Sequence, residues 1–165
     1  RRFFDEHADK VDVFFFGNDM GSQLDCMISP AMFRELIFPY YRQLIDLAKS
    51  YGKKVALHSC GSVDRIIPDI IEMGVDVLHP IQAKAAHMDA EHLHAAYGSK
   101  IIFLGGVDTP QLLPFGSEEE VKQEVLRLRG VFGKHYICSP SHEALLPNVS
   151  PEKLLIMSKT ATKII

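Results

Sequence analysis

The chain has 165 residues, 47% of them apolar and 24% charged, and a formal net charge of −3. This composition is typical of a globular domain and excludes a disordered chain, while the scattered basic residues give no nucleic-acid-binding face. No apolar stretch approaches the roughly 20 residues of a membrane span, and the N-terminus has no signal-peptide pattern.

Five short apolar runs alternate with helical stretches along the chain. Near-continuous apolar runs are typical of parallel strands covered on both faces, so we expect strands at residues 11–16, 54–58, 75–79, 101–105 and 135–138. Capping and terminating residues predict the intervening helices. The expected boundaries, in chain order, are Ser29-Pro30 to Gly52 with a kink at Pro39, Ser62 or Asp64 to Gly74, Asp89 to Gly98, the Ser117–Glu120 capping box to Gly133, and Ser150-Pro151 onward.

This alternation predicts an α/β fold with a parallel sheet, in one domain over residues 1–165. Two architectures fit it. Five units can form a complete doubly wound sheet, which the pattern alone slightly favours because such a sheet needs only five strands. They can also be five of the eight units of a (β/α)8 barrel, and the polar residues favour that reading.

Polar residues follow every expected strand, at the end where barrels and open α/β sheets build their sites. In chain order they are Asn18, Asp19 and Gln23; His58, Cys60 and Gly61; His79 and Gln82; Gly106 and Asp108; and Cys138, Ser139 and His142. Any one of them could be a turn residue or a helix cap, Asp108 before Thr109-Pro110 included. Five such strand ends together indicate a functional site.

The most specific pattern is His58-Ser59-Cys60 together with Cys138. At the end of a strand, residues i and i+2 point to one face, so His58 and Cys60 can bind one ion while Ser59 points away. One imidazole and two thiolates suit zinc, and three protein ligands leave the open position of a catalytic site. Cys138 can reach the same ion only if the sheet curves, which favours a barrel. Cys26 has no histidine partner and is expected to be structural.

Several segments resemble the uroporphyrinogen decarboxylase superfamily. Residues 18–23 resemble its D-D-x-G-x-Q segment, and residues 52–61 closely resemble its G-K-x-x-x-x-H-x-C-G strand. Gly105-Gly106-Val107-Asp108 resembles its G-G-x-D turn, and residues 139–142 with Pro147 and Pro151 resemble its closing segment. The resemblance runs from about residue 11 to the end. It implies a (β/α)8 barrel of which these are the last five units, and the start at Arg1 without an initiator methionine fits an excised segment.

The resemblance also implies a branch of the superfamily. Its methylcorrinoid:thiol methyltransferases, of the coenzyme M type, carry the H-x-C pair and a distant cysteine as zinc ligands. By that likeness His58, Cys60 and Cys138 would bind zinc, and the methyl group would pass from a corrinoid on a partner protein to a small-molecule acceptor. Asp19, Asp108 and His142 would serve catalysis or hold the acceptor, and the remaining candidates would bind substrate. These are Asn18, Gln23, His79 and Gln82, of which Asn18 and His79 depart from the residues that relatives often have.

Alternatives stay open. A metal-free uroporphyrinogen decarboxylase, a lyase of porphyrin biosynthesis, would use Asp19 on pyrrole nitrogens and place His142 at the pocket. The chain could also be a catalytically incomplete fragment, or the acceptor could be a folate-type cofactor. Three cysteines, an odd number, favour a reducing cytoplasm over a disulfide framework. The two open edges of a partial barrel, at residues 11–16 and 135–138, predict a homo-oligomer.

Overall fold

The computed structural model describes residues 1–163 and contains a five-stranded sheet in the order β1-β2-β3-β4-β5. All four neighbouring pairs are parallel. The strands are β1 (Val13–Gly17), β2 (Lys54–His58), β3 (Val77–Ile81), β4 (Ile102–Val107) and β5 (Tyr136–Pro140). Strands in sequence order are those of consecutive barrel units. A doubly wound sheet reverses its strand order at a switch point, so that alternative is wrong.

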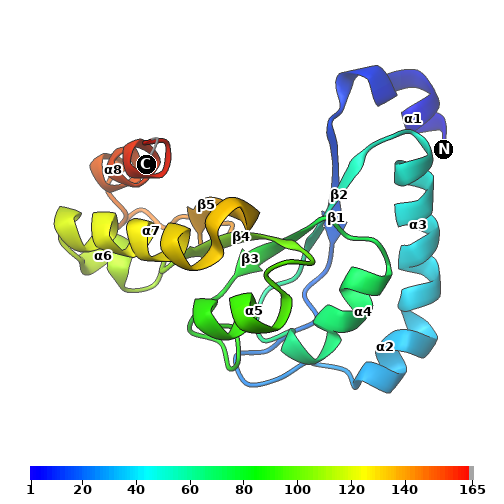
Figure 1. The fold of residues 1–165 in the computed structure, drawn as a ribbon, viewed down its shortest axis with the longest axis horizontal. Helices are drawn as coiled ribbons and strands as arrows, with labels where there is room; N and C mark the ends of the chain where they lie inside the picture. Colours follow the sequence, from blue (N-terminus) through cyan, green and yellow to red (C-terminus); the bar gives the residue numbers. More distant parts are fainter. Residues whose placement is uncertain (164–165) are drawn as a thin grey trace.

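Helices connect the strands and follow them in an arc, from α3 through α4 and α5 to α7 and α8 (Figure 1). They are α1 (Arg2–His7), α2 (Pro30–Leu36), α3 (Phe38–Ser50), α4 (Ile67–Glu72), α5 (Ala90–Tyr97), α6 (Leu112–Phe115), α7 (Glu118–Phe132) and α8 (Pro151–Ala161). Short 3-10 turns lie at Ala8–Lys10, Asp64–Ile66 and Gly133–His135. Of the helices described, none is long and apolar enough to cross a membrane.

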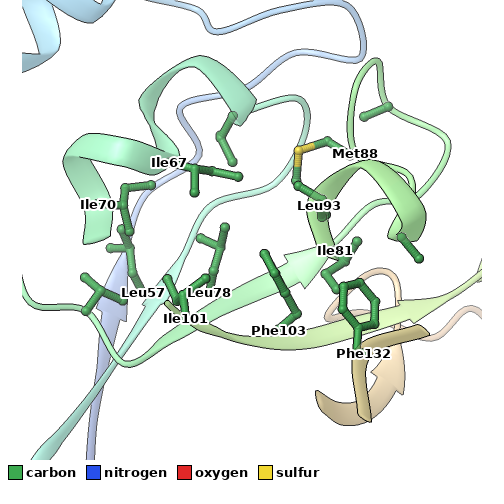
Figure 2. Close-up of a cluster of buried hydrophobic side chains, with 14 of the residues drawn as sticks. Leu57, Ile67, Ile70, Leu78, Ile81, Met88, Leu93, Ile101, Phe103 and Phe132 are labelled. Atoms are coloured by element: carbon green, nitrogen blue, oxygen red, sulfur yellow. The ribbon is translucent and has the colours of Figure 1, made fainter. Parts of the chain in front are cut away.

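The two faces of the sheet differ in burial. Leu57, Leu78 and Phe103 come from three adjacent strands, are fully buried and pack beneath the helices (Figure 2). On the opposite face Phe15 is 54% exposed and Ile137 is 45% exposed. A sheet with one covered face and one open face is what part of a barrel wall presents, since the open face is the barrel interior.

The core lies between the strands and the helices. Figure 2 shows Ile67 and Ile70 of α4, Leu93 of α5 and Phe132 of α7 directed at the strand residues. Each side chain of this size contributes roughly 1.5–3 kcal/mol when fully buried. This packing holds the strands in register and therefore fixes where their carboxyl ends lie.

Four of the expected N-caps are confirmed. The side chains of Ser29, Asp89, Ser117 and Ser150 each accept a hydrogen bond from a backbone N–H in the first turn of the following helix. Glu120 completes the capping box at Ser117. Local sequence therefore determines these four helix starts.

The helical stretch is interrupted next to Pro39, as expected, but it forms two helices instead of one kinked helix. α2 ends at Leu36, and α3 begins at Phe38 with Pro39 in its first turn. Proline lacks the N–H that a helix interior needs but fits the first turn, where that N–H has no partner within the helix. The chain accordingly starts a new helix there.

The expected cap at Ser62 or Asp64 is wrong. A 3-10 turn precedes α4, and no side-chain cap is present at either start. Both side chains bind elsewhere: Ser62 donates to the carbonyl of Ala86, and Asp64 accepts from His92. At the end of α5, Gly98 has a φ of −58°, so it does not take the left-handed conformation expected of a terminating glycine.

Four strands differ from the expected ones by one or two residues at both ends, and all eight boundaries lie closer to the C-terminus. The first, third, fourth and fifth strands start and end later than expected, while β2 matches at both ends. β3 continues through Pro80 to Ile81, although proline donates no hydrogen bond to a neighbouring strand. The shift of β5 matters most, since it places Cys138 inside a strand.

Candidate metal and substrate site

Asp19, His58 and Cys60 converge at the carboxyl ends of the first two strands. His58 ends β2 and pairs in register with Gly17 of β1, so the loop after β1 passes over it. Nε2 of His58 lies 3.0 Å from Oδ1 of Asp19 and 3.7 Å from Sγ of Cys60. One ligand atom from each of the three residues lies within 4.8 Å of the others. An oxygen, a nitrogen and a sulfur at these separations fit a zinc ion, which accepts all three donor types.

Ser59 holds the two loops of this cluster together. It is fully buried, and its hydroxyl accepts a hydrogen bond of 2.9 Å from the backbone N–H of Met20. Its own N–H donates to the carbonyl of His79 at 2.7 Å. His58 and Cys60, on either side of it, therefore face the cluster, as the alternation of a strand end predicts.

Glycine is required where these loops touch. Gly61 has a φ of +82°, and a Cβ there would overlap the backbone carbonyl of Gly21. Only glycine combines that conformation with so close an approach. The contact brings Asp19, two residues before Gly21, over Cys60, whose N–H donates to Oδ1 of Asp19 at 2.9 Å.

The environment shifts the protonation of the cluster. The hydrogen bond from the Cys60 N–H, with the nearby His58, holds the pKa of Asp19 below its usual range. Burial, followed by the Asp19 charge, raises the pKa of the Cys60 thiol to about 11. Cys60 is thus a neutral thiol at neutral pH until a cation stabilises its thiolate.

Two further groups contact the other nitrogen of His58. Nδ1 of His58 lies 3.0 Å from Nδ1 of His79 and 3.6 Å from a carboxylate oxygen of Glu143. Desolvation, then the proximity of His58, lowers the pKa of His79 to about 4. Glu143 is a residue that the sequence analysis missed. It follows the closing motif directly, and only the path of that loop brings it over β2.

Cys138 lies on the opposite face of the sheet from His58. Tyr136 pairs in register with the buried Phe103, and its ring stacks on Phe132 of α7, so it points to the helices. Cys138, two residues further along β5, shares that face and packs against the core. Burial raises the pKa of its thiol. The structure therefore does not bring Cys138 together with the cluster.

The remaining candidates line two cavities. Asn18 borders an apolar cavity of about 290 Å³, together with Asp19 and the side chains of Met27, Leu36 and Tyr40. Gln23, Gln82, Asp108 and His142 line a second cavity of about 250 Å³, which we call the polar cavity after these four side chains. Cys26, expected to be structural, forms an isolated bridge with Gly21 and is partly buried.

Comparison with known proteins gives one family and one fold. The family model described as "Uroporphyrinogen decarboxylase (URO-D)" matches residues 13–164. Among solved structures, the chain is similar to a methyltransferase from Methanosarcina mazei, at 21% sequence identity and a TM-score of 0.73. That match covers 93% of this chain and 42% of the other, so the chain spans less than half the length of the structure it resembles. No curated protein matches it.

Proposed function

The chain belongs to the uroporphyrinogen decarboxylase family, whose fold is a (β/α)8 barrel, and on that premise we propose that it carries the metal site of a zinc-dependent methyltransferase. The methyl group would move from a methylcorrinoid on a separate protein to a thiol or similar nucleophile. The observation that carries this proposal is the convergence of Asp19, His58 and Cys60. Three mixed ligands leave a fourth position open for the acceptor, as in catalytic zinc sites.

The domain assignment belongs to the same proposal. Residues 1–165 would be the C-terminal portion of a barrel domain, contributing five of its eight units. The strand order supports this, because consecutive barrel strands pair in sequence order. The exposed inner face at Phe15 and Ile137 supports it as well, since further strands would cover that face in a closed barrel.

The chemistry requires a nucleophilic sulfur and a controlled proton. Zinc, when bound, would lower the pKa of the acceptor thiol and keep it ionised. The sulfur would attack the methyl carbon as a nucleophile and form the carbon–sulfur bond, and the departing corrinoid would keep the electron pair of the broken cobalt–carbon bond. Glu143 beside His58 would take up the thiol proton and release it to solvent, because its carboxylate is exposed at the mouth.

A corrinoid protein needs access to this mouth. Met27, Leu36 and Tyr40 are each more than half exposed beside Asp19 and give an apolar surface against which such a partner could pack. The three free cysteines fit a reducing cytoplasm, which we propose as the location.

A metal-free decarboxylase is the rival function, and the position of Cys138 favours it. The methyltransferase branch would use this cysteine as the third ligand, yet here it faces the helices. In the methyltransferase proposal Asp19 takes that third place, which replaces a thiolate by a carboxylate. A carboxylate is an ordinary zinc ligand.

Metal analysis distinguishes the methyltransferase from the decarboxylase. It is made on the full-length protein, in which residues 1–165 would be the last five units of a closed barrel. Protein prepared with excess zinc and then dialysed should keep about one zinc per chain and methylate a thiol from free methylcobalamin, detected as the S-methyl product by mass spectrometry. Cys60→Ser should lose the metal, while the matched control Cys26→Ser should keep it. Protein without zinc that releases carbon dioxide from uroporphyrinogen would replace this proposal with the decarboxylase.

A further inference from the structure

The polar cavity adjoins the sulfur of the metal-binding cluster through Gln82. This side chain accepts a hydrogen bond of 3.0 Å from Gln23 and lies near the thiol of Cys60. Gln23, Gln82, Asp108 and His142 line the cavity together with the exposed Lys84. A ligand in the cavity can therefore extend toward the open position of the cluster.

Asp108 is the unpartnered polar group of this cavity. The residue is only 8% exposed, and its Oδ1 atom has no hydrogen-bond partner among residues 1–163. Its backbone is fixed, because its carbonyl accepts from Leu113 and the next N–H, of Thr109, donates to the Ser141 hydroxyl. A buried acceptor without a donor is rare in folded proteins, so its donor is expected to be a group other than a protein residue, such as water, an ion or a ligand.

Asp69 provides the internal comparison. It is as deeply buried and also has one unpartnered oxygen, but its other oxygen binds Arg34 at 2.6 Å, and it lines neither the polar nor the apolar cavity. Asp69 therefore belongs to a structural ion pair. Asp108 lines the polar cavity and has no ion-pair partner among residues 1–163, whereas Asp69 is bound to an arginine.

We propose that the polar cavity binds the ammonium group of a small aminothiol, with Asp108 as its acceptor. A carboxylate accepts hydrogen bonds only, and its strong partners are cationic donors. A sulfonate or carboxylate at this depth would face Asp108 with like charge. Lys84 offsets little of that repulsion, because the charge of an exposed side chain is screened by water. Binding of the ligand's sulfur to the metal depends on the function proposed above. Binding of its ammonium group depends only on Asp108.

A series of thiols of similar size tests the class of ligand. Calorimetric titration of the zinc-loaded full-length protein would compare cysteamine, 2-mercaptoethanol, 2-mercaptoethanesulfonate and 3-mercaptopropionate. Cysteamine should bind at least about tenfold more tightly than each of the others, the gain expected from one charge-assisted hydrogen bond. Equal or tighter binding of either acid would overturn the proposal.

A second titration separates this inference from the zinc chemistry. 2-(Methylthio)ethylamine and 2-(methylthio)ethanol have no thiol, so their affinities for metal-free protein report on the ammonium site alone. The amine should bind more tightly than the alcohol even if the parent protein holds no zinc, in which case only the proposed function fails. No preference for the amine in this titration overturns the ammonium site. The proposed function still stands in that case if the metal analysis finds zinc in the protein.

Two matched variants test whether Asp108 causes the tighter binding of the amine. Asp108→Asn keeps the shape and removes the charge, so the affinities of amine and alcohol should converge to within about twofold. Asp69→Asn should leave the preference intact although it breaks an ion pair. An undiminished preference in Asp108→Asn would assign the ammonium group to another residue. If that variant fails to fold, the ligand series on the unaltered protein still decides.

Discussion

The Nδ1 atoms of His58 and His79 lie 3.0 Å apart at positions paired in register across β2 and β3. Two imidazole nitrogens in a hydrogen bond share one hydrogen, so one ring donates and the other accepts. A metal on Nε2 of His58 leaves the hydrogen on Nδ1, which makes His79 the acceptor. His79 would then fix the orientation and tautomer of the ligand.

The first prediction concerns this pair. His79→Leu should weaken zinc binding by roughly 10–100-fold, the usual cost of losing the partner of a histidine ligand, whereas His79→Asn should keep most of the affinity. Competition with a chromophoric chelator measures it. The control is His92→Leu, which removes a histidine bound to Asp64. Equal zinc affinity in the Leu variant and the unaltered protein would refute a role for His79.

The second prediction separates the three cysteines. Cobalt(II) substituted for zinc should give the near-ultraviolet sulfur-to-metal absorption of a single thiolate ligand. Cys60→Ser should abolish this band, while Cys138→Ser and Cys26→Ser should retain it, because Cys138 faces the helices. A band that falls by about half in Cys138→Ser would instead restore the ligand set that the family resemblance implies.

The third prediction concerns Gly61. Gly61→Ala should cost at least about 2–3 kcal/mol of unfolding free energy and weaken metal binding, since the added methyl group forces the loops of Gly21 and Cys60 apart. Gly52→Ala is the matched control. Gly52 has a similar φ of +71° but open space around its Cβ position, so only about 1–2 kcal/mol is expected there. Urea titrations of both variants provide the comparison.

The fourth prediction is that the stabilisation of the fold by Asp76 is lost at acidic pH. Burial would raise the pKa of this carboxyl, but hydrogen bonds from Lys49 and the Val55 N–H outweigh it and hold the pKa below its usual range. A depressed folded-state pKa stabilises the fold above the unfolded-state pKa, and this contribution disappears as the pH falls through the folded-state value. Asp76→Asn should therefore cost about 1–3 kcal/mol at pH 7. The difference in melting temperature between this variant and the unaltered protein should become smaller below about pH 4.

The fifth prediction is self-association of the 165-residue chain through its open face. Phe15 is 54% exposed on the uncovered side of β1, which is also an edge strand. Phe15→Lys should lower the weight-average mass measured by sedimentation equilibrium. The substitution places a charge on the apolar surface through which two copies of the chain would associate. Leu24→Lys, at a loop residue that is 81% exposed, should have little effect. A clean monomer of the unaltered chain at tens of micromolar would contradict the prediction.

Much of the fold could be predicted because it depends on local signals. Apolar runs predict the five strands, and Ser29 and Asp89 predict the starts of two helices. The alternation of side chains at a strand end predicts that His58 and Cys60 face the same side. The motifs that resemble the uroporphyrinogen decarboxylase superfamily identified the family correctly. In each case the deciding residues are neighbours in the sequence.

Cys138 shows what local signals do not determine. The apolar run at residues 135–138 predicts a fifth strand that ends at Cys138, with this side chain at the mouth. The strand in fact runs on to Pro140, and its register pairs Tyr136 with the buried Phe103, which sets Cys138, two residues further on, on the helix side. Asp19 and Glu143 join the cluster for a similar reason. Their positions depend on contacts between distant loops, such as Met20 with Ser59, which no short window of sequence contains.

The metal-binding cluster and the polar cavity are built from different β/α units of the chain. Every atom of the metal-binding cluster comes from the first two β/α units, whereas three of the four principal residues of the polar cavity, Gln82, Asp108 and His142, follow the third, fourth and fifth strands. Mutations that remodel the acceptor pocket can therefore accumulate in one half of the chain while the other half stays constant. Such a layout would let a lineage diversify its acceptors by recombination within the gene, with Gln82 as the junction that must match both halves.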